Sequence, residues 1–163
     1  ITINACKAAV WAATTDIARF AEILSGVEKI EIVEKAATRP SGGQAGLVGL
    51  KWKETRILFG KSATVEKRIT EAKANEFYTT RAEQASSSRP SGNGFVFITT
   101  NRVSGTDGNV VLTGIHETKQ QGFAAKVKAL PMVFFKGMIK KAIMKDLEDV
   151  KAVVERGSSA TAR

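Results

Sequence analysis

The amino-acid sequence predicts an α+β domain in which a long antiparallel sheet wraps around one C-terminal helix, and three observations lead to it. Residues 27–119 alternate between apolar and polar side chains over six segments that are joined mostly by short turns. Residues 123–156 carry their apolar residues at helical spacing instead. A short β-branched segment and an alanine-rich stretch precede both. Because an antiparallel sheet with one apolar face needs a cover, we expect the C-terminal helix to pack on it.

The length and composition suit a single globular domain. The chain has 163 residues, of which 43% are hydrophobic and 25% charged, enough to bury a sizeable core. We expect one domain over residues 1–156 and a flexible tail over 157–163. No apolar run reaches the roughly 18 residues that a membrane span needs. The first residues do not have the pattern of a signal peptide, and residues upstream of Ile1 are left open.

The cysteine content and the charge place limits on location and partners. Cys6 is the only cysteine, so we expect a reduced, buried side chain and a cytoplasmic protein. The formal charge of +9 favours anionic partners. The lysines and arginines are scattered, however, without the interleaved aromatic residues of a nucleic-acid groove. We therefore interpret the charge as a solvated surface and expect no nucleic-acid partner. The alternative is a basic surface that binds an acidic protein or nucleic acid.

The expected elements follow one another in a simple order. Residues 1–6 form a strand, residues 7–24 form two short helices, and Ser25-Gly26 ends them. The main helix is expected to begin near Pro131 and to end at Gly157. The strands between them are expected over residues 27–36, 47–59, 62–73, 76–85, 95–104 and 109–119, with loops over 38–46 and 86–94. With the first strand, the curved sheet has seven strands. Such a sheet cannot touch one helix along its whole width, so we expect an apolar pocket between them.

Four stretches of the chain, in this order, carry a resemblance to a known superfamily. They are Val10-Trp11 followed by residues 16–20 (DIARF), residues 26–32 (GVEKIEI), Trp52 with residues 54–56 (ETR), and residues 59–61 (FGK). Over residues 1–156 they resemble the helix-grip fold of the SRPBCC (START-like) superfamily, and most of all its polyketide cyclase/dehydrase and lipid-transport-like branch. The resemblance implies a cavity that binds apolar molecules. It supplies no universal catalytic motif.

Two charged residues follow Trp52 at alternate positions. Alternation groups them on one face with apolar residues of the same predicted strand: Val48, Leu50, Trp52, Glu54, Arg56 and Leu58. If this face is concave, Glu54 and Arg56 point inward and need partners, because burying an unpaired charge is costly. They would then anchor a carboxyl, carbonyl or hydroxyl group of a ligand. An equally weighted alternative is a bulge that reverses the face, or a place at the pocket mouth. Glu66 and Arg68 are weaker candidates for the same cluster.

His116 is the only histidine, and its pKa could suit a general base. Alternation places it with Val110, Leu112 and Gly114, so it could face the pocket mouth. No Ser-His-Asp or Cys-His order surrounds it. We therefore favour an ordinary hydrogen-bonded histidine at the surface or at a strand end. With one histidine, one cysteine and no clustered carboxylates, we expect no metal site and no cofactor.

The C-terminal helix is expected to form a wall of the pocket, although the same residues could simply pack in the core. Asp146 falls within its apolar sector, and we expect a local lysine or a loop N–H to be its partner. Lysines on the opposite side (Lys136, Lys140, Lys141, Lys145) give weak support for membrane contact. Trp11 is expected to dock the short helices on the sheet. The predicted ligand-binding set is Trp52, Glu54, Arg56, Tyr78, Phe97, His116, Phe134, Phe135, Met138, Ile139 and Ala142.

Two functions are compatible with these expectations. The first is binding, or transport, of a hydrophobic small molecule or lipid in the internal cavity. The second is a polyketide cyclase/dehydratase-like enzyme, with Glu54, Arg56, Tyr78 or His116 acting as base, anchor and acid. The second requires at least two of these side chains to converge on the pocket. The sequence shows no complete catalytic set, so enzymatic activity, the ligand and the oligomeric state stay open.

Overall fold

The computed structural model describes residues 1–36, 46–58, 61–83, 94–121 and 132–161. Their strands form one antiparallel sheet in the order β1-β7-β6-β5-β4-β3-β2. The strands are β1 (Thr2–Ile3), β2 (Val27–Glu34), β3 (Lys51–Leu58), β4 (Lys61–Lys73), β5 (Phe77–Glu83), β6 (Gly94–Thr106) and β7 (Asn109–Gln121). The helices are α1 (Lys7–Thr15), the 3₁₀ turn η1 (Ile17–Arg19), α2 (Phe20–Ile23) and α3 (Met132–Thr161).

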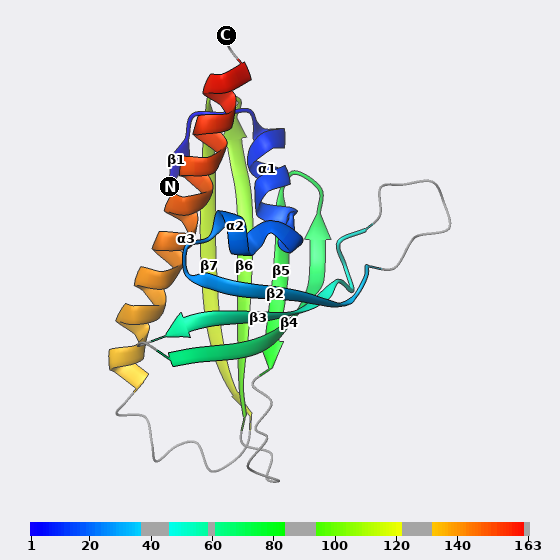
Figure 1. Cartoon of the computed structure of the whole chain (residues 1–163), viewed down its shortest axis with the longest axis vertical. Helices are drawn as coiled ribbons and strands as arrows, with labels where there is room; N and C mark the ends of the chain where they lie inside the picture. Colours follow the sequence, from blue (N-terminus) through cyan, green and yellow to red (C-terminus); the bar gives the residue numbers. More distant parts are fainter. Residues whose placement is uncertain (37–45, 59–60, 84–93, 122–131, 162–163) are drawn as a thin grey trace.

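The sheet is strongly curved. In Figure 1, β5, β6 and β7 run along the long axis of the molecule, whereas β2, β3 and the first part of β4 run across it. The second part of β4 turns to pair with β5. Helix α3 lies along β7 and β1, and α1 packs against both α3 and β6. The predicted α+β architecture, a seven-stranded curved sheet around a C-terminal helix, is therefore confirmed.

Two predicted turns follow from residues that tolerate positive φ. Asn75, between β4 and β5, has φ 59°, and the Glu76 N–H donates to the Lys73 carbonyl at 3.0 Å. Gly105 and Gly108, at the β6–β7 hairpin, have φ 85° and 78°. A Cβ on Gly105 would lie 2.4 Å from the carbonyl oxygen of Asn109. Only glycine fits this closely spaced hairpin end.

The structure differs from the predicted element ends in several places, and three differences are the largest. The first strand covers only Thr2–Ile3 rather than residues 1–6. β3 begins at Lys51 rather than at residue 47, because Gly49 adopts φ 93° and interrupts the extended backbone. Val48 is 44% exposed, so grouping it with Trp52 on one inward face was wrong. α3 does not end at Gly157 but continues to Thr161. The expected loops over 38–46 and 86–94 lie almost wholly outside the described residues.

Cys6 is a further correction, because its side chain is exposed rather than buried. It is the residue just before α1, with φ −74° and ψ 146°. The backbone turns there from β1 into the helix, and the thiol stays outside the core.

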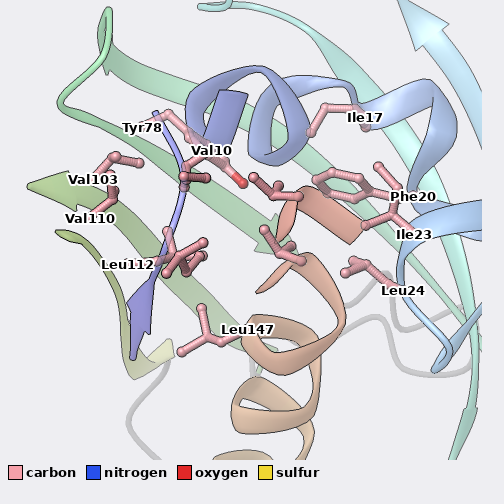
Figure 2. Close-up of a cluster of buried hydrophobic side chains, with 14 of the residues drawn as sticks. Val10, Ile17, Phe20, Ile23, Leu24, Tyr78, Val103, Val110, Leu112 and Leu147 are labelled. Carbon is pink, nitrogen blue, oxygen red and sulfur yellow. The ribbon is translucent and has the colours of Figure 1, made fainter. Parts of the chain in front are cut away.

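The core lies at one end of the molecule, under the short helices. Figure 2 shows Val10 from α1, Val103 from β6 and Leu112 from β7 gathered with Leu147 from α3. Residues of the helical segment before β2 close the same cluster, and each is 8% exposed or less: Ile17, Phe20, Ile23 and Leu24. The second half of α3 also supplies Val150 and Val154. Within the described ranges, no helix is both long enough and apolar enough to cross a bilayer.

Candidate functional site

The register of the sheet decides which side chains face its interior, because directly opposed residues share a face. One cross-strand row runs through Trp52, Lys67, Ala82, Phe97 and Thr118. Trp52 is only 1% exposed, so the row faces the covered, concave side.

The neighbouring row leads to the histidine in the same way. It runs through Ile69, Thr80, Thr99 and His116. Ile69 is fully buried, so this row too faces the concave side. Both rows therefore place predicted site residues on one face of the sheet.

Strand β3 carries three of the predicted site residues to this face. Glu54 Oε2 accepts from Trp52 Nε1 at 3.2 Å. Glu54 Oε1 accepts from Arg56 Nε at 2.5 Å and from Lys67 Nζ at 2.7 Å. Glu54 is only 2% exposed. The pair therefore faces inward, and the alternative of a reversed face is wrong.

Arg56 also reaches across to the helix. Its Nη1 donates to Asp146 Oδ1 at 3.1 Å and its Nη2 to Oδ2 at 2.8 Å, a two-pronged contact with α3. The expectation that Asp146 has a local lysine or a loop N–H as its partner was wrong. We call Glu54, Arg56, Lys67 and Asp146 the buried charge cluster. Its two carboxylates balance its two cations.

Burial and ion pairing have opposite effects on the pKa values of the buried charge cluster. Burial alone raises the pKa of Glu54, but the charges and hydrogen bonds of Lys67 and Arg56 outweigh it and hold that pKa at about 2. Burial lowers the pKa of Arg56, yet Glu54 and Asp146 raise it above its ordinary value. For Asp146, burial outweighs Arg56 and the pKa is raised. Glu54 is therefore ionised at neutral pH and is a weak base.

Tyr78 faces the same side but belongs to the core. It is 3% exposed, and burial, together with the negative charge of Glu54, raises the pKa of its hydroxyl. The ring of Trp11 meets it edge-on, with centroids 6.2 Å apart and an angle of 77°. The expected docking role of Trp11 is confirmed by this contact and by its packing against the core.

His116 lies inward and is held on two sides. Its Nδ1 is 2.9 Å from Thr99 Oγ1, and its ring stacks on Phe97 with centroids 5.8 Å apart and an angle of 22°. Burial lowers the pKa of His116, and the positive charge of Lys67 lowers it further. The favoured expectation of an ordinary hydrogen-bonded histidine is confirmed, but its expected place at the surface or at a strand end was wrong. Lys67 lies on β4 and His116 on β7, three strands apart in the sheet. The charge of Lys67 nevertheless acts on the imidazole, so the curvature of the sheet brings the two side chains toward one space.

The inward face differs from the core in one respect. Side chains of both cross-strand rows stay partly exposed although they face inward: Lys67, Phe97, Thr99 and His116. On α3, Ile139 and Ala142 are also partly exposed, and each lies one helical turn before a residue that contacts the sheet, Ile143 or Asp146. Phe134, Phe135 and Met138 lie on α3, but their side chains are outside the described part of the structure. The described residues contain no group of histidine, cysteine and carboxylate side chains that could hold a metal ion.

Lys67 was missed as a site residue, although a signal for it existed. Val65 and Ile69 lie two residues before and after it on the same strand, so they share its face. Because both are apolar, that face is expected to point inward. Glu66 and Arg68, the expected candidates on this strand, lie on the outward face, opposite Lys53 and Lys51. Their assignment to the cluster was wrong.

Comparison with known proteins places this architecture in a class. No family model and no curated protein matches the chain. The Zhui aromatase/cyclase from Streptomyces sp. R1128 is similar in structure, with a TM-score of 0.67, 19% identity, and coverage of 96% of this chain and 90% of that one. A START superfamily protein from Mycobacterium smegmatis has a TM-score of 0.66 at 11% identity, with 96% and 94% covered.

A third similar structure is a larger protein. The di-domain ARO/CYC StfQ from the steffimycin biosynthetic pathway has a TM-score of 0.69 at 13% identity. The match covers 98% of this chain but only 50% of StfQ, so the chain spans half of that protein. At these identities the likeness defines the fold alone. The chain has the helix-grip fold that these structures share, and the predicted resemblance to the SRPBCC superfamily is confirmed at the level of the fold.

Proposed function

We propose that this protein binds, and can carry, a hydrophobic small molecule or lipid between the concave face of the sheet and the first half of α3. The observation that carries the proposal is the partial exposure of inward-facing side chains there, of which Phe97, Ile139 and Ala142 are apolar. At the other end of α3 the equivalent space is filled by core residues such as Leu147. An inward surface that combines apolar side chains with placed polar groups suits an apolar ligand that carries a polar function.

The polar groups of the face would orient the ligand rather than bind it strongly. The buried charge cluster is internally balanced, so it gives no net attraction for a charged molecule. Lys67 has three donors, and the Lys67–Glu54 hydrogen bond uses one of them. Lys67 and His116 could therefore bond a carbonyl or hydroxyl group of an otherwise apolar ligand. The predicted wall residues Phe134, Phe135 and Met138 remain part of this proposal, as does a cytoplasmic location.

A cyclase- or dehydratase-like activity on a polyketide-like molecule is the second candidate. It requires at least two of the four candidate side chains to converge on the pocket, and the contact between Glu54 and Arg56 on the concave face supports it in part. Their chemistry argues against catalysis, because the low pKa of Glu54 makes it a poor base and Arg56 keeps its proton. Tyr78 is buried in the core. His116, neutral at pH 7, would have to act as the base.

The binding proposal is tested with a fluorescent apolar probe, N-phenyl-1-naphthylamine, and with native mass spectrometry for a co-purified ligand. Ala142→Phe should weaken probe binding by about tenfold by filling the space. Ala152→Phe is the matched control, since Ala152 is exposed on the same helix. Wild type that binds no probe and carries no ligand, or a folded Ala142→Phe variant with unchanged affinity, would contradict the proposal. Turnover of a bound molecule that is lost in His116→Gln while binding persists would favour the second candidate.

A further inference from the structure

The concave face of the sheet is closed at one end and open at the other. On β6 and β7, the opposed inward residues Val103 and Leu112 are 2% and 1% exposed and belong to the core. Two inward pairs further along, Thr99 and His116 are partly exposed, and Thr118, in the next inward pair, is exposed. The proposed ligand site therefore has an inner end beside the core and an outer end toward the start of β6.

Helix α3 shows the same gradient. Leu147 is 7% exposed and lies in the core, and the residue before it, Asp146, accepts two hydrogen bonds from Arg56. Ala142 and Ile139, about one and two turns earlier, are apolar and partly exposed. The buried charge cluster thus borders the inner end of the site, while Ala142 and Ile139 offer apolar contacts toward the outer end.

The charges on the concave face cancel. Among the side chains that the structure describes, the charged ones on this face are the two carboxylates and two cations of the cluster: Glu54, Asp146, Arg56 and Lys67. Hydrogen bonds connect all four. Asp149, on the next turn of α3, has partners of its own in Lys145 and Ser25. The inner end of the site is therefore polar but carries no net charge.

This balance decides which chemical group the inner end accepts. An ionised carboxylate or ammonium group brought there would add a charge that the cluster does not compensate, and burying such a charge is costly. A neutral group avoids that cost. It must also present an acceptor oxygen, because an ammonium group has three donors and no acceptor, and Lys67 uses one donor on Glu54.

We infer that the ligand places a neutral group with an acceptor oxygen, such as a ketone or an ester, at the inner end of the site, against Lys67 and His116. Its apolar part extends toward the outer end along Ala142 and Ile139. The inference rests on the proposed function and names the ligand class within it. It selects uncharged carbonyl compounds with a long apolar part and disfavours the corresponding free acids and amines.

The test compares two ligands of equal chain length, 2-dodecanone and dodecanoate, as competitors of N-phenyl-1-naphthylamine at pH 8 and below the micellar concentration. We expect wild type to bind the ketone about tenfold more tightly than the acid. Lys67→Met should weaken ketone binding by about tenfold, because it removes the donor. Lys73→Met, on the same strand with a side chain 65% exposed, is the matched control and should bind within about twofold of wild type.

A charge variant tests the balance directly. Asp146→Asn keeps an oxygen acceptor for Arg56 but leaves the cluster with one excess positive charge. It should bind dodecanoate about tenfold more tightly than wild type does, with ketone affinity changed by less than about twofold. Circular dichroism checks that each variant is folded.

NMR of the complex with 2-dodecanone tests the direction of the ligand. We expect nuclear Overhauser contacts from the methyl group beside the carbonyl to the His116 ring, and from the terminal methyl group to Ile139. The reverse contacts, equal affinity of wild type for ketone and acid, unchanged ketone affinity in Lys67→Met, or no gain for dodecanoate in folded Asp146→Asn would each overturn the inference alone. Wild type that binds neither the fluorescent probe nor the ketone would overturn the proposed function as well.

Discussion

Arg56 on β3 and Asp146 on α3 meet through two hydrogen bonds of 3.1 and 2.8 Å. Asp146 immediately precedes Leu147, a core residue that is 7% exposed. The contact therefore fixes α3 to the sheet at the boundary between the solid core and the partly exposed inward face. This position relates the stability of the fold to the proposed ligand site.

Replacing Arg56 should be costly. Arg56→Met leaves Glu54 and Asp146 without their shared partner, so we expect the free energy of unfolding to fall by about 3–5 kcal/mol. Urea denaturation followed by circular dichroism measures it. Arg19→Met is the matched control, because the Arg19–Glu22 pair is 59% and 67% exposed and solvent screens it, so its loss should change the free energy of unfolding far less. A loss of the same size in both variants would contradict the role given to the cluster.

Acid should weaken the fold through Glu54. Its folded pKa of about 2 lies below the ordinary 4.5, so its contribution is complete above pH 4.5 and is lost as pH falls toward 2. The shift corresponds to about 3 kcal/mol at most. The raised pKa of Asp146 acts in the opposite direction and reduces the net loss. The free energy of unfolding, measured from pH 6 to pH 3, should fall more steeply in wild type than in Glu54→Gln. Equal slopes in the two proteins would refute this assignment.

His116 should titrate below its ordinary range. Burial and the charge of Lys67 lower its pKa from 6.5, so the folded state loses stability as pH falls below 6.5 and the unfolded chain takes up the proton. NMR of the imidazole gives the pKa directly. His116→Gln should flatten the stability curve between pH 7 and 5.5, and since this is the only histidine, no other imidazole contributes. An imidazole pKa of 6.5 or above would show that the ring is not held as described.

Gly114 on β7 should resist even a methyl group. A Cβ there would lie 2.9 Å from Ile143 Cγ2 and 3.9 Å from Leu147 Cδ1, both on α3. Gly114→Ala should therefore displace the helix and cost about 1–3 kcal/mol of stability. Gly137→Ala on α3 is the contrasting control, because no atom of the described part of the chain lies within 4 Å of its added Cβ and alanine favours a helix. Equal effects of the two variants would mean that α3 is not so closely packed on β7.

The sequence by itself determined the grouping of Trp52, Glu54 and Arg56 on one face. This grouping depends only on the two-residue period of a strand, which holds whatever the strand packs against. The order of strands and helices was predictable for a similar reason, because turn residues and apolar spacing are local. Gly49 shows the limit of such a prediction. Its positive φ shortens β3, although the alternating pattern continues through Val48 and Leu50.

Only the tertiary structure decided which face is buried and which charges meet. Arg56 and Asp146 are 90 residues apart in the chain, and a helical wheel assigns Asp146 to a sector without naming its partner. Curvature of the sheet turns Lys67 and His116 toward one space. It also makes the face with Lys67 the concave one, rather than the alternate face with Glu66 and Arg68. These outcomes depend on how far the sheet bends and where the helix docks. Both are set by the packing of the whole core rather than by any local segment.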